Sequence, residues 1–183
     1  MSLRGNGNRW IAPMAEGEGD FLEGELPARA FATLTTPYRL APDRLSELFR
    51  EWVRNVQAHE RMTLGWISSV EINPQPHIHA TLIAASPLNC VHAGALWRAL
   101  VGPRYEQAAR VKPYENGLCG LGYVLKRLGS PRVEPQFSDN IRAFVTGDGK
   151  SMFKTDSRQR RQVRRVKAVI RAQCSRTTQE SRE

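Results

Sequence analysis

The segment from Pro76 to Ala84, with the sequence PHIHATLIA, constrains the fold more strongly than any other part of this chain. Polar and apolar residues alternate along it, which is typical of a β-strand with one face in the core. His77, His79 and Thr81 therefore share one face of the predicted strand. The other face is apolar and carries Ile78, Ala80 and Leu82. This pattern predicts an antiparallel sheet with helices on one side and the histidines on the other.

A hairpin is expected around this strand. Residues 73–76, NPQP, are typical of a tight turn, and they separate two β-prone runs, Thr63–Ile72 and His77–Ala85. If these runs pair, Glu71 points to the same face as the two histidines. Two imidazole nitrogens and a carboxylate oxygen would form an incomplete coordination shell for a divalent metal ion, with room for substrate. The predicted metal ligands are His77, His79 and Glu71.

The remaining elements follow from periodicity and from proline and glycine stops. Two further strands are predicted at Arg29–Thr36 and Tyr105–Lys112. Three helices are predicted at Pro42–Glu60, Cys90–Val101 and Gly117–Leu128. The first helix has an apolar stripe typical of a core-facing helix, which consists of Leu45, Leu48, Phe49, Trp52, Val53 and Val56.

Strand, helix, strand, strand, helix, strand is the order of a ferredoxin-like α+β fold, in which a central antiparallel sheet has flanking helices. We therefore predict an α+β domain over residues 29–135. Residues 1–28, rich in glycine, asparagine and glutamate, are interpreted as a flexible leader. Residues 136–183 are interpreted as a basic, partly helical extension, because arginines and valines recur there at helical spacing.

The charge of the chain favours a polyanionic partner. Its 183 residues have a net charge of +9 and a pI of about 10.1. Such an excess of positive charge is most often used to bind nucleic acid, with an acidic membrane surface as the weaker alternative. No apolar stretch is long enough to span a bilayer, and Met1 to Trp10 lacks the apolar core of a signal peptide.

The three cysteines of the chain indicate a reducing compartment. Cys90, Cys119 and Cys174 are widely spaced and form no Cys-x-x-Cys pair, which argues against a disulfide framework or a structural zinc site. Together with the absence of an apolar span, this pattern predicts a cytoplasmic protein.

Three motifs occur in a fixed order along the predicted domain. They are Phe31 to Pro37 (FATLTTP) on the first strand, His77 to His79 (HIH) on the hairpin, and Tyr123 to Lys126 (YVLK) on the third helix. This series resembles the HUH endonucleases, and in particular the single-tyrosine replication initiators (Rep proteins) of rolling-circle replication. The resemblance covers about Ala30 to Leu128, and its specificity lies in the order of the motifs because each one alone is common.

The resemblance implies a role for each matching position. His77, His79 and Glu71 would bind Mg²⁺ or Mn²⁺, and Tyr123 would attack a phosphodiester of single-stranded DNA. Lys126 would be its companion, stabilising the phenolate or the transition-state charge. The product would be a 5′-phosphotyrosine linkage and a free 3′-hydroxyl. The enzyme would thus be a nicking and joining endonuclease of a plasmid, phage or related element.

The resemblance also implies single-stranded DNA, at an origin or a hairpin, as the partner. Arg110 and Lys112 alternate on the predicted strand before the tyrosine helix and so share a face. With them, the candidate DNA contacts are Arg104, Arg127, Thr33 and Thr35. No Walker A motif is present, so a host helicase and polymerase would have to unwind and copy the DNA.

Several alternatives stay open. A compact transposase of the IS200/IS605 type also combines one tyrosine with histidine-hydrophobe-histidine, although its tyrosine is usually followed by glutamine. A non-catalytic DNA-binding module would bind a hairpin or origin without cutting. A cupin also has His-x-His on a strand, but it needs a later strand histidine, and His92 lies in a predicted helix. If Tyr123 is not the nucleophile, the alternatives are Tyr114, Tyr105 and Tyr38.

Overall fold

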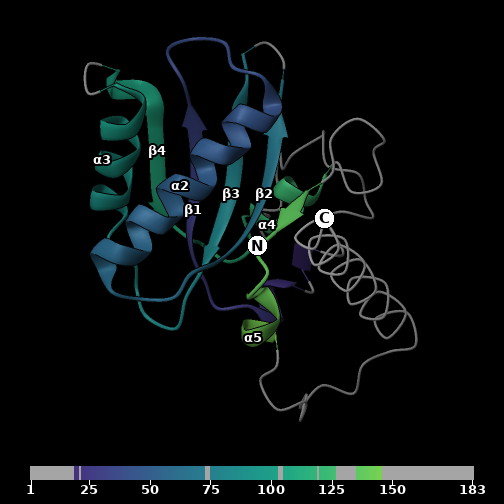
Figure 1. Ribbon diagram of the computed structural model, residues 1–183. Helices are drawn as coiled ribbons and strands as arrows, with labels where there is room; N and C mark the ends of the chain where they lie inside the picture. Colours follow the sequence, from purple (N-terminus) through teal and green to yellow (C-terminus); the bar gives the residue numbers. More distant parts are fainter. Residues whose placement is uncertain are drawn as a thin grey trace, which may run out of the picture.

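An open, five-stranded antiparallel sheet forms the centre of the chain, with strand order β4-β1-β3-β2-β5. The computed structural model describes residues 19–20, 22–72, 75–102, 105–118, 120–126 and 135–145. The strands are β1 (Ala28–Thr35), β2 (Gly65–Glu71), β3 (His77–Ile83), β4 (Ala109–Pro113) and β5 (Gln136–Phe137). Figure 1 shows helices against both faces of this sheet. The predicted α+β class, with a central antiparallel sheet and flanking helices, is confirmed.

Helices α2 (Pro42–Glu60) and α3 (Cys90–Val101) cover one face and have the predicted limits. Pro42 begins α2, where a missing N–H costs nothing, and Arg61 ends it in the left-handed conformation with φ 52°. The apolar stripe of α2 is buried in the larger core, as expected. Within the described part of the chain, no helix has the length and apolar character needed to cross a membrane.

The apolar face of the central hairpin packs under these two helices. Ile78, Ala80 and Leu82 are fully buried there, which confirms the predicted alternation along β3. One tryptophan indole joins the two helices, and another joins α3 to the sheet. Trp52 Nε1 donates to the carbonyl of Ala93 on α3 at 2.8 Å, and Trp97 Nε1 donates to the carbonyl of Thr35 on β1 at 2.8 Å.

The histidine face also carries helices, which corrects the expectation that all of them lie on one side. Helices α4 (Gly120–Leu125) and α5 (Ile141–Val145) pack over the end of this face that holds Ile67 and Ile83. Those two side chains are fully buried. Apolar residues at this end need cover from water, and Tyr123 of α4 also packs against His79 at the polar end.

Two predicted elements are shorter than expected. The tyrosine helix α4 spans Gly120–Leu125 rather than Gly117–Leu128, because Gly117 has φ +83°, outside helical geometry. A 3₁₀ turn, Glu106–Ala108, replaces the first part of the strand predicted at Tyr105–Lys112.

Residues on both sides of the predicted domain contact its second core. Leu22 and Leu26 are buried against α4 and the sheet. A Cβ on Gly19 would collide with the backbone of Gly122, so the two segments approach closely. On the other side, Ser138 exchanges two hydrogen bonds with the backbone of Trp66, at 2.9 and 3.0 Å. The domain limits stay a prediction, and residues 146–183 lie outside the described part of the chain.

Candidate metal centre

The strand register brings the three predicted ligands together at the polar end of the sheet. Glu71 on β2 lies directly opposite His77 on β3, and His79 follows on the same face. Nε2 of His77 lies 3.7 Å from Oε2 of Glu71, and Nε2 of His79 lies 3.7 Å from Oε1. One ligand atom from each residue lies within 4.8 Å of the others. We call Glu71, His77 and His79 the metal centre.

Hydrogen bonds orient both imidazoles toward Glu71. Nδ1 of His77 lies 2.7 Å from the carbonyl oxygen of Gln75, which can only accept, so this nitrogen carries the proton. Nδ1 of His79 lies 3.2 Å from the hydroxyl of Thr33, which can accept in the same way. In that tautomer Nε2 of each ring is unprotonated and faces the carboxylate. Oxygen partners of this kind fix metal-binding histidines in many proteins.

Charge and burial set the protonation of the centre. Burial alone would raise the pKa of Glu71, but the ion pair with the Lys126 ammonium, together with the two imidazoles, holds that pKa below its usual value. Burial, helped by the neighbouring His77, lowers the pKa of His79 to about 4, although Glu71 opposes the shift. At neutral pH the centre therefore holds a carboxylate and a neutral His79 imidazole, the forms that bind metal ions.

These residues fit a divalent metal ion. Nε2 of His79 is buried and has no hydrogen-bond partner among the described residues, although a buried nitrogen normally has one. Two imidazoles and a carboxylate suit manganese and other divalent transition metals, and they leave positions open for water or substrate. A cation held here would complete the coordination of His79.

Tyr123 lies beside the centre. Its ring packs against the His79 ring at a centroid distance of 4.6 Å and an interplanar angle of 83°. Phe31 touches both rings, at 5.9 Å from His79 and 6.3 Å from Tyr123. Lys126 lies in the turn that ends α4 rather than within the helix, and its Nζ sits 3.6 Å from the centroid of the Tyr123 ring. One ammonium group thus contacts both Glu71 and Tyr123.

The alternative tyrosines have other surroundings. The Tyr114 hydroxyl donates to Glu23 at 2.5 Å and accepts from the backbone N–H of Leu121 at 3.0 Å. Tyr105 packs against the core under α2 and α3, on the opposite side of the sheet from the metal centre. Tyr38 is half exposed and contacts neither histidine ring. Tyr123 is therefore the candidate whose ring reaches the imidazoles.

A row of polar side chains crosses the sheet beside the centre. Thr33 pairs with His79 on one side and with Arg110 on the other, so all three lie on one face. Lys112 lies two residues further along the edge strand β4, and both cations are exposed. Thr35, one row away, donates to the carbonyl of Ala108 at 3.4 Å. The other two candidate DNA contacts, Arg104 and Arg127, lie outside the described residues.

Two features of the site were not predicted from the sequence. Thr33 was assigned to DNA, but its hydroxyl contacts His79 in the structure. Lys126 was paired with Tyr123 alone, but it also forms the ion pair with Glu71. The register of β1 against β3 would have indicated the first contact, whereas the second joins segments 55 residues apart and has no local signal.

Comparisons with known proteins identify no family for this chain. No model of a protein family matches the chain, and no curated protein matches it. One similar solved structure is the crystal structure of the hypothetical protein ORF119 from Sulfolobus islandicus rod-shaped virus 1. It is 14% identical, covers 63% of this chain and 90% of its own, and gives a TM-score of 0.40. At that identity and TM-score the likeness says nothing about function.

Proposed function

We propose that this chain is a metal-dependent endonuclease of single-stranded DNA that uses Tyr123 to nick and rejoin strands, as replication initiators of the single-tyrosine HUH type do. One observation carries this proposal: the Tyr123 ring lies against His79, 4.6 Å between centroids, next to a cluster that fits a divalent metal ion. A phenol and a metal site side by side are what phosphodiester transesterification by tyrosine requires.

The residues of the metal centre would hold Mg²⁺ or Mn²⁺, which when bound supplies positive charge to a phosphate oxygen. Glu71 is held ionised by Lys126, and His79 is held neutral by burial, so both are ready to coordinate at neutral pH. Thr33 and the carbonyl of Gln75 keep the two rings oriented. The chain itself therefore supplies a preorganised donor set.

Tyr123 would supply the nucleophile. Its hydroxyl loses a proton to solvent and attacks phosphorus, so that a P–O bond forms to the tyrosine oxygen. The P–O bond to the 3′-oxygen of the scissile phosphodiester breaks, and that oxygen takes up a proton. Lys126, against the ring face, stabilises the negative charge that develops. The same steps in reverse rejoin the strand, and no further reactant is needed.

Exposed cations on the edge strand are suited to guide the DNA. Arg110 and Lys112 lie on the same face as the metal centre, at the edge of the sheet. Phosphates bound there would lead a single strand across Thr33 toward His79. The net charge of +9 favours such a polyanion.

The test is covalent capture of DNA by the full chain. The protein is incubated with Mn²⁺ and a labelled pool of randomised single-stranded and hairpin oligonucleotides, then separated under denaturing conditions. We expect a protein–DNA adduct that depends on metal, disappears with EDTA and is absent in Tyr123→Phe. Sequencing the captured DNA then identifies the recognition site.

Tyr105→Phe is the matched control, because Tyr105 packs against the core on the opposite side of the sheet from the metal centre. It should keep the adduct. An adduct that survives Tyr123→Phe would refute the assigned nucleophile. DNA binding without any adduct across the pool would favour a non-catalytic binding module, and strand exchange restricted to paired hairpin ends would favour a transposase.

A further inference from the structure

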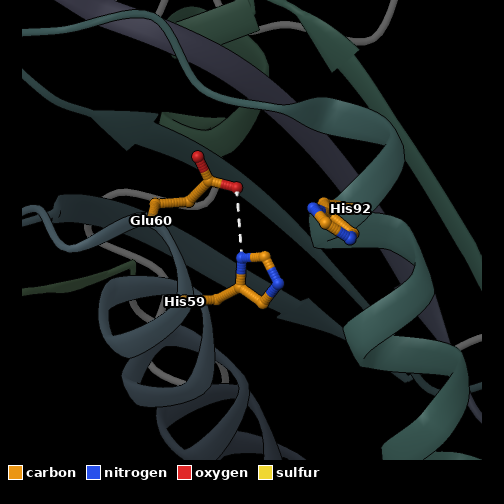
Figure 2. Close-up of side chains that lie close together, drawn as sticks. All are labelled: His59, Glu60 and His92. Atoms are coloured by element: carbon orange, nitrogen blue, oxygen red, sulfur yellow. Dashed lines mark ion pairs between the residues drawn. The ribbon is translucent and has the colours of Figure 1, made fainter.

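The four histidines of the chain fall into two groups, and one group lies outside the metal centre. His59 is in the last turn of α2, and His92 is in the first turn of α3. Figure 2 shows these rings converging with the carboxylate of Glu60 between the two helices. One ligand atom from each lies within 4.8 Å of the others. We call His59, Glu60 and His92 the helix-junction cluster.

The contacts within the cluster are close but incomplete. The His59 and His92 rings meet edge to face, with centroids 4.1 Å apart and an interplanar angle of 65°. Nδ1 of His59 lies 3.8 Å from Oε1 of Glu60, too long for a hydrogen bond (Figure 2). Donor atoms at these separations need only small side-chain rotations to reach one ion at about 2.1 Å.

The backbone under the cluster is fixed, so the ligands start from defined positions. Trp52 on α2 donates to the carbonyl of Ala93, the residue after His92, and both Trp52 and Ala93 are buried. The carbonyl end of the 19-residue helix α2 also concentrates negative charge near His59. This negative charge at the end of α2 favours the binding of a cation at the junction.

We infer that His59, Glu60 and His92 form a second divalent-metal site, for a transition metal such as Zn²⁺. The bound ion would hold the end of α2 against the start of α3. Two imidazole nitrogens and one carboxylate oxygen are a ligand set that zinc, cobalt and nickel accept, with water in the remaining positions. The cluster lies against α2 and α3, whereas the metal centre lies on the opposite face of the sheet. This site is therefore independent of the proposed DNA chemistry.

Cys90 does not belong to this ligand set. Its sulfur lies 3.7 Å from the carbonyl oxygen of Leu88 and is not among the ligand atoms that converge at the junction. Metal binding at the junction should thus depend on the two imidazoles and Glu60.

The stoichiometry of Zn²⁺ bound to the full chain tests this inference. Since all four histidines belong to the two clusters, histidine-dependent binding elsewhere is excluded. By calorimetry and by the visible absorption of Co²⁺, the wild type should bind two ions per chain. His92→Gln and His77→Gln should each bind one, and the double variant none. His92→Gln is a mild change, because position 92 is the third residue of α3, where glutamine is well tolerated.

A second measurement tests whether the bound ion holds α2 and α3 together. In His77→Gln, where only the junction can bind metal, Zn²⁺ should slow amide hydrogen exchange in the first turn of α3 and raise the thermal midpoint. In His92→Gln the first turn of α3 should not respond to Zn²⁺. Equal Zn²⁺ binding by His92→Gln and wild type, or no change in exchange at α3, would overturn the inference. The DNA adduct should form normally in His92→Gln, so failure here is distinct from failure of the proposed nuclease.

Discussion

The metal centre and the helix-junction cluster contain the same residue types, two histidines and one glutamate, but differ in how the chain holds them. In the metal centre, paired strands set the spacing, and oxygen partners fix both rings through Nδ1. In the helix-junction cluster the residues lie at two helix ends, and both imidazoles are exposed. In the first set His79 is buried beside a tyrosine and the other two residues are partly buried, whereas the second set lies at the surface.

This difference shows that the same residue types suit two different proposed roles, one catalytic and one stabilising. Catalysis needs ligands held within a few tenths of an ångström and water kept from the reacting atoms. Strand register sets the positions of Glu71 and His79, and burial limits the access of water to His79. A stabilising site needs only that the ion bind the folded chain better than the unfolded one, which exposed ligands at the end of α2 can provide.

The largest contrast is expected from the same substitution in each site. Glu71→Gln removes the anionic ligand and leaves Lys126 without its ion pair, so the rate of adduct formation should fall by about 10³-fold. Glu60→Gln should change that rate by less than about twofold, because Glu60 lies on the other side of the sheet. Single-turnover assays on the captured oligonucleotide measure both. Equal losses of rate in the two variants would contradict the proposed difference in role between the two sites.

The second contrast concerns the hydrogen bonds that orient the imidazole rings, which are present in the metal centre. Thr33→Val keeps the shape of the side chain but removes the oxygen beside Nδ1 of His79, so affinity for Mn²⁺ should fall by roughly 10 to 100-fold. Thr35→Val is the matched control, since Thr35 lies on the same strand and face but contacts the carbonyl of Ala108. Calorimetry with Mn²⁺ measures both variants. If Thr33→Val binds like the wild type, the hydrogen bond does not orient the ring.

Local sequence signals predicted the juxtaposition of Glu71, His77 and His79. Strand alternation and the proline-containing turn place Glu71 opposite His77, and that pairing depends on neighbours close in sequence. The limits of α2 and α3 were also predicted, because Pro42 and Gly102 are strong start and stop signals. Such features are read from a few consecutive residues.

The features that were missed join distant segments. Ser138 pairs with Trp66 across 72 residues, and β5 and α5 have no periodic pattern of their own. The helix-junction cluster joins His59 and His92 only because α2 and α3 pack together. Tertiary packing decides such contacts, and no local pattern in a single sequence encodes them.

The pH dependence of stability distinguishes a buried histidine ligand from an exposed one. The unfolded chain protonates His79 near its ordinary pKa of 6.5, whereas in the folded chain that pKa is about 4. The unfolded state therefore binds more protons between these values, and stability is lost as the pH falls. With a chelator present, the free energy of unfolding should drop by about 2 kcal/mol between pH 7 and pH 5.

His79→Gln should remove most of this pH dependence, and Thr35→Val, which changes no titratable group, should keep it. Glu71 does not interfere, because its pKa is already lowered from 4.5 and it stays ionised across this range. Urea unfolding at a series of pH values measures the effect. A His79→Gln variant with the wild-type slope would show that burial of this ring does not set its protonation.

The smallest contrast is expected from the surface cations on the two sides of the sheet. Arg110→Ala and Lys112→Ala remove charges from the face of the metal centre, so each should weaken single-stranded DNA binding a few-fold. Each should also make the negative slope of log K against log[salt] shallower by about 0.7. Arg54→Ala, an exposed position on α2, removes the same charge from the side of the helix-junction cluster and should leave the slope near that of the wild type. Because net charge falls equally in Arg110→Ala and Arg54→Ala, a difference between them reports where the DNA lies rather than how basic the chain is. Equal slopes would mean that DNA is attracted by overall charge and does not follow the row from Arg110 to His79.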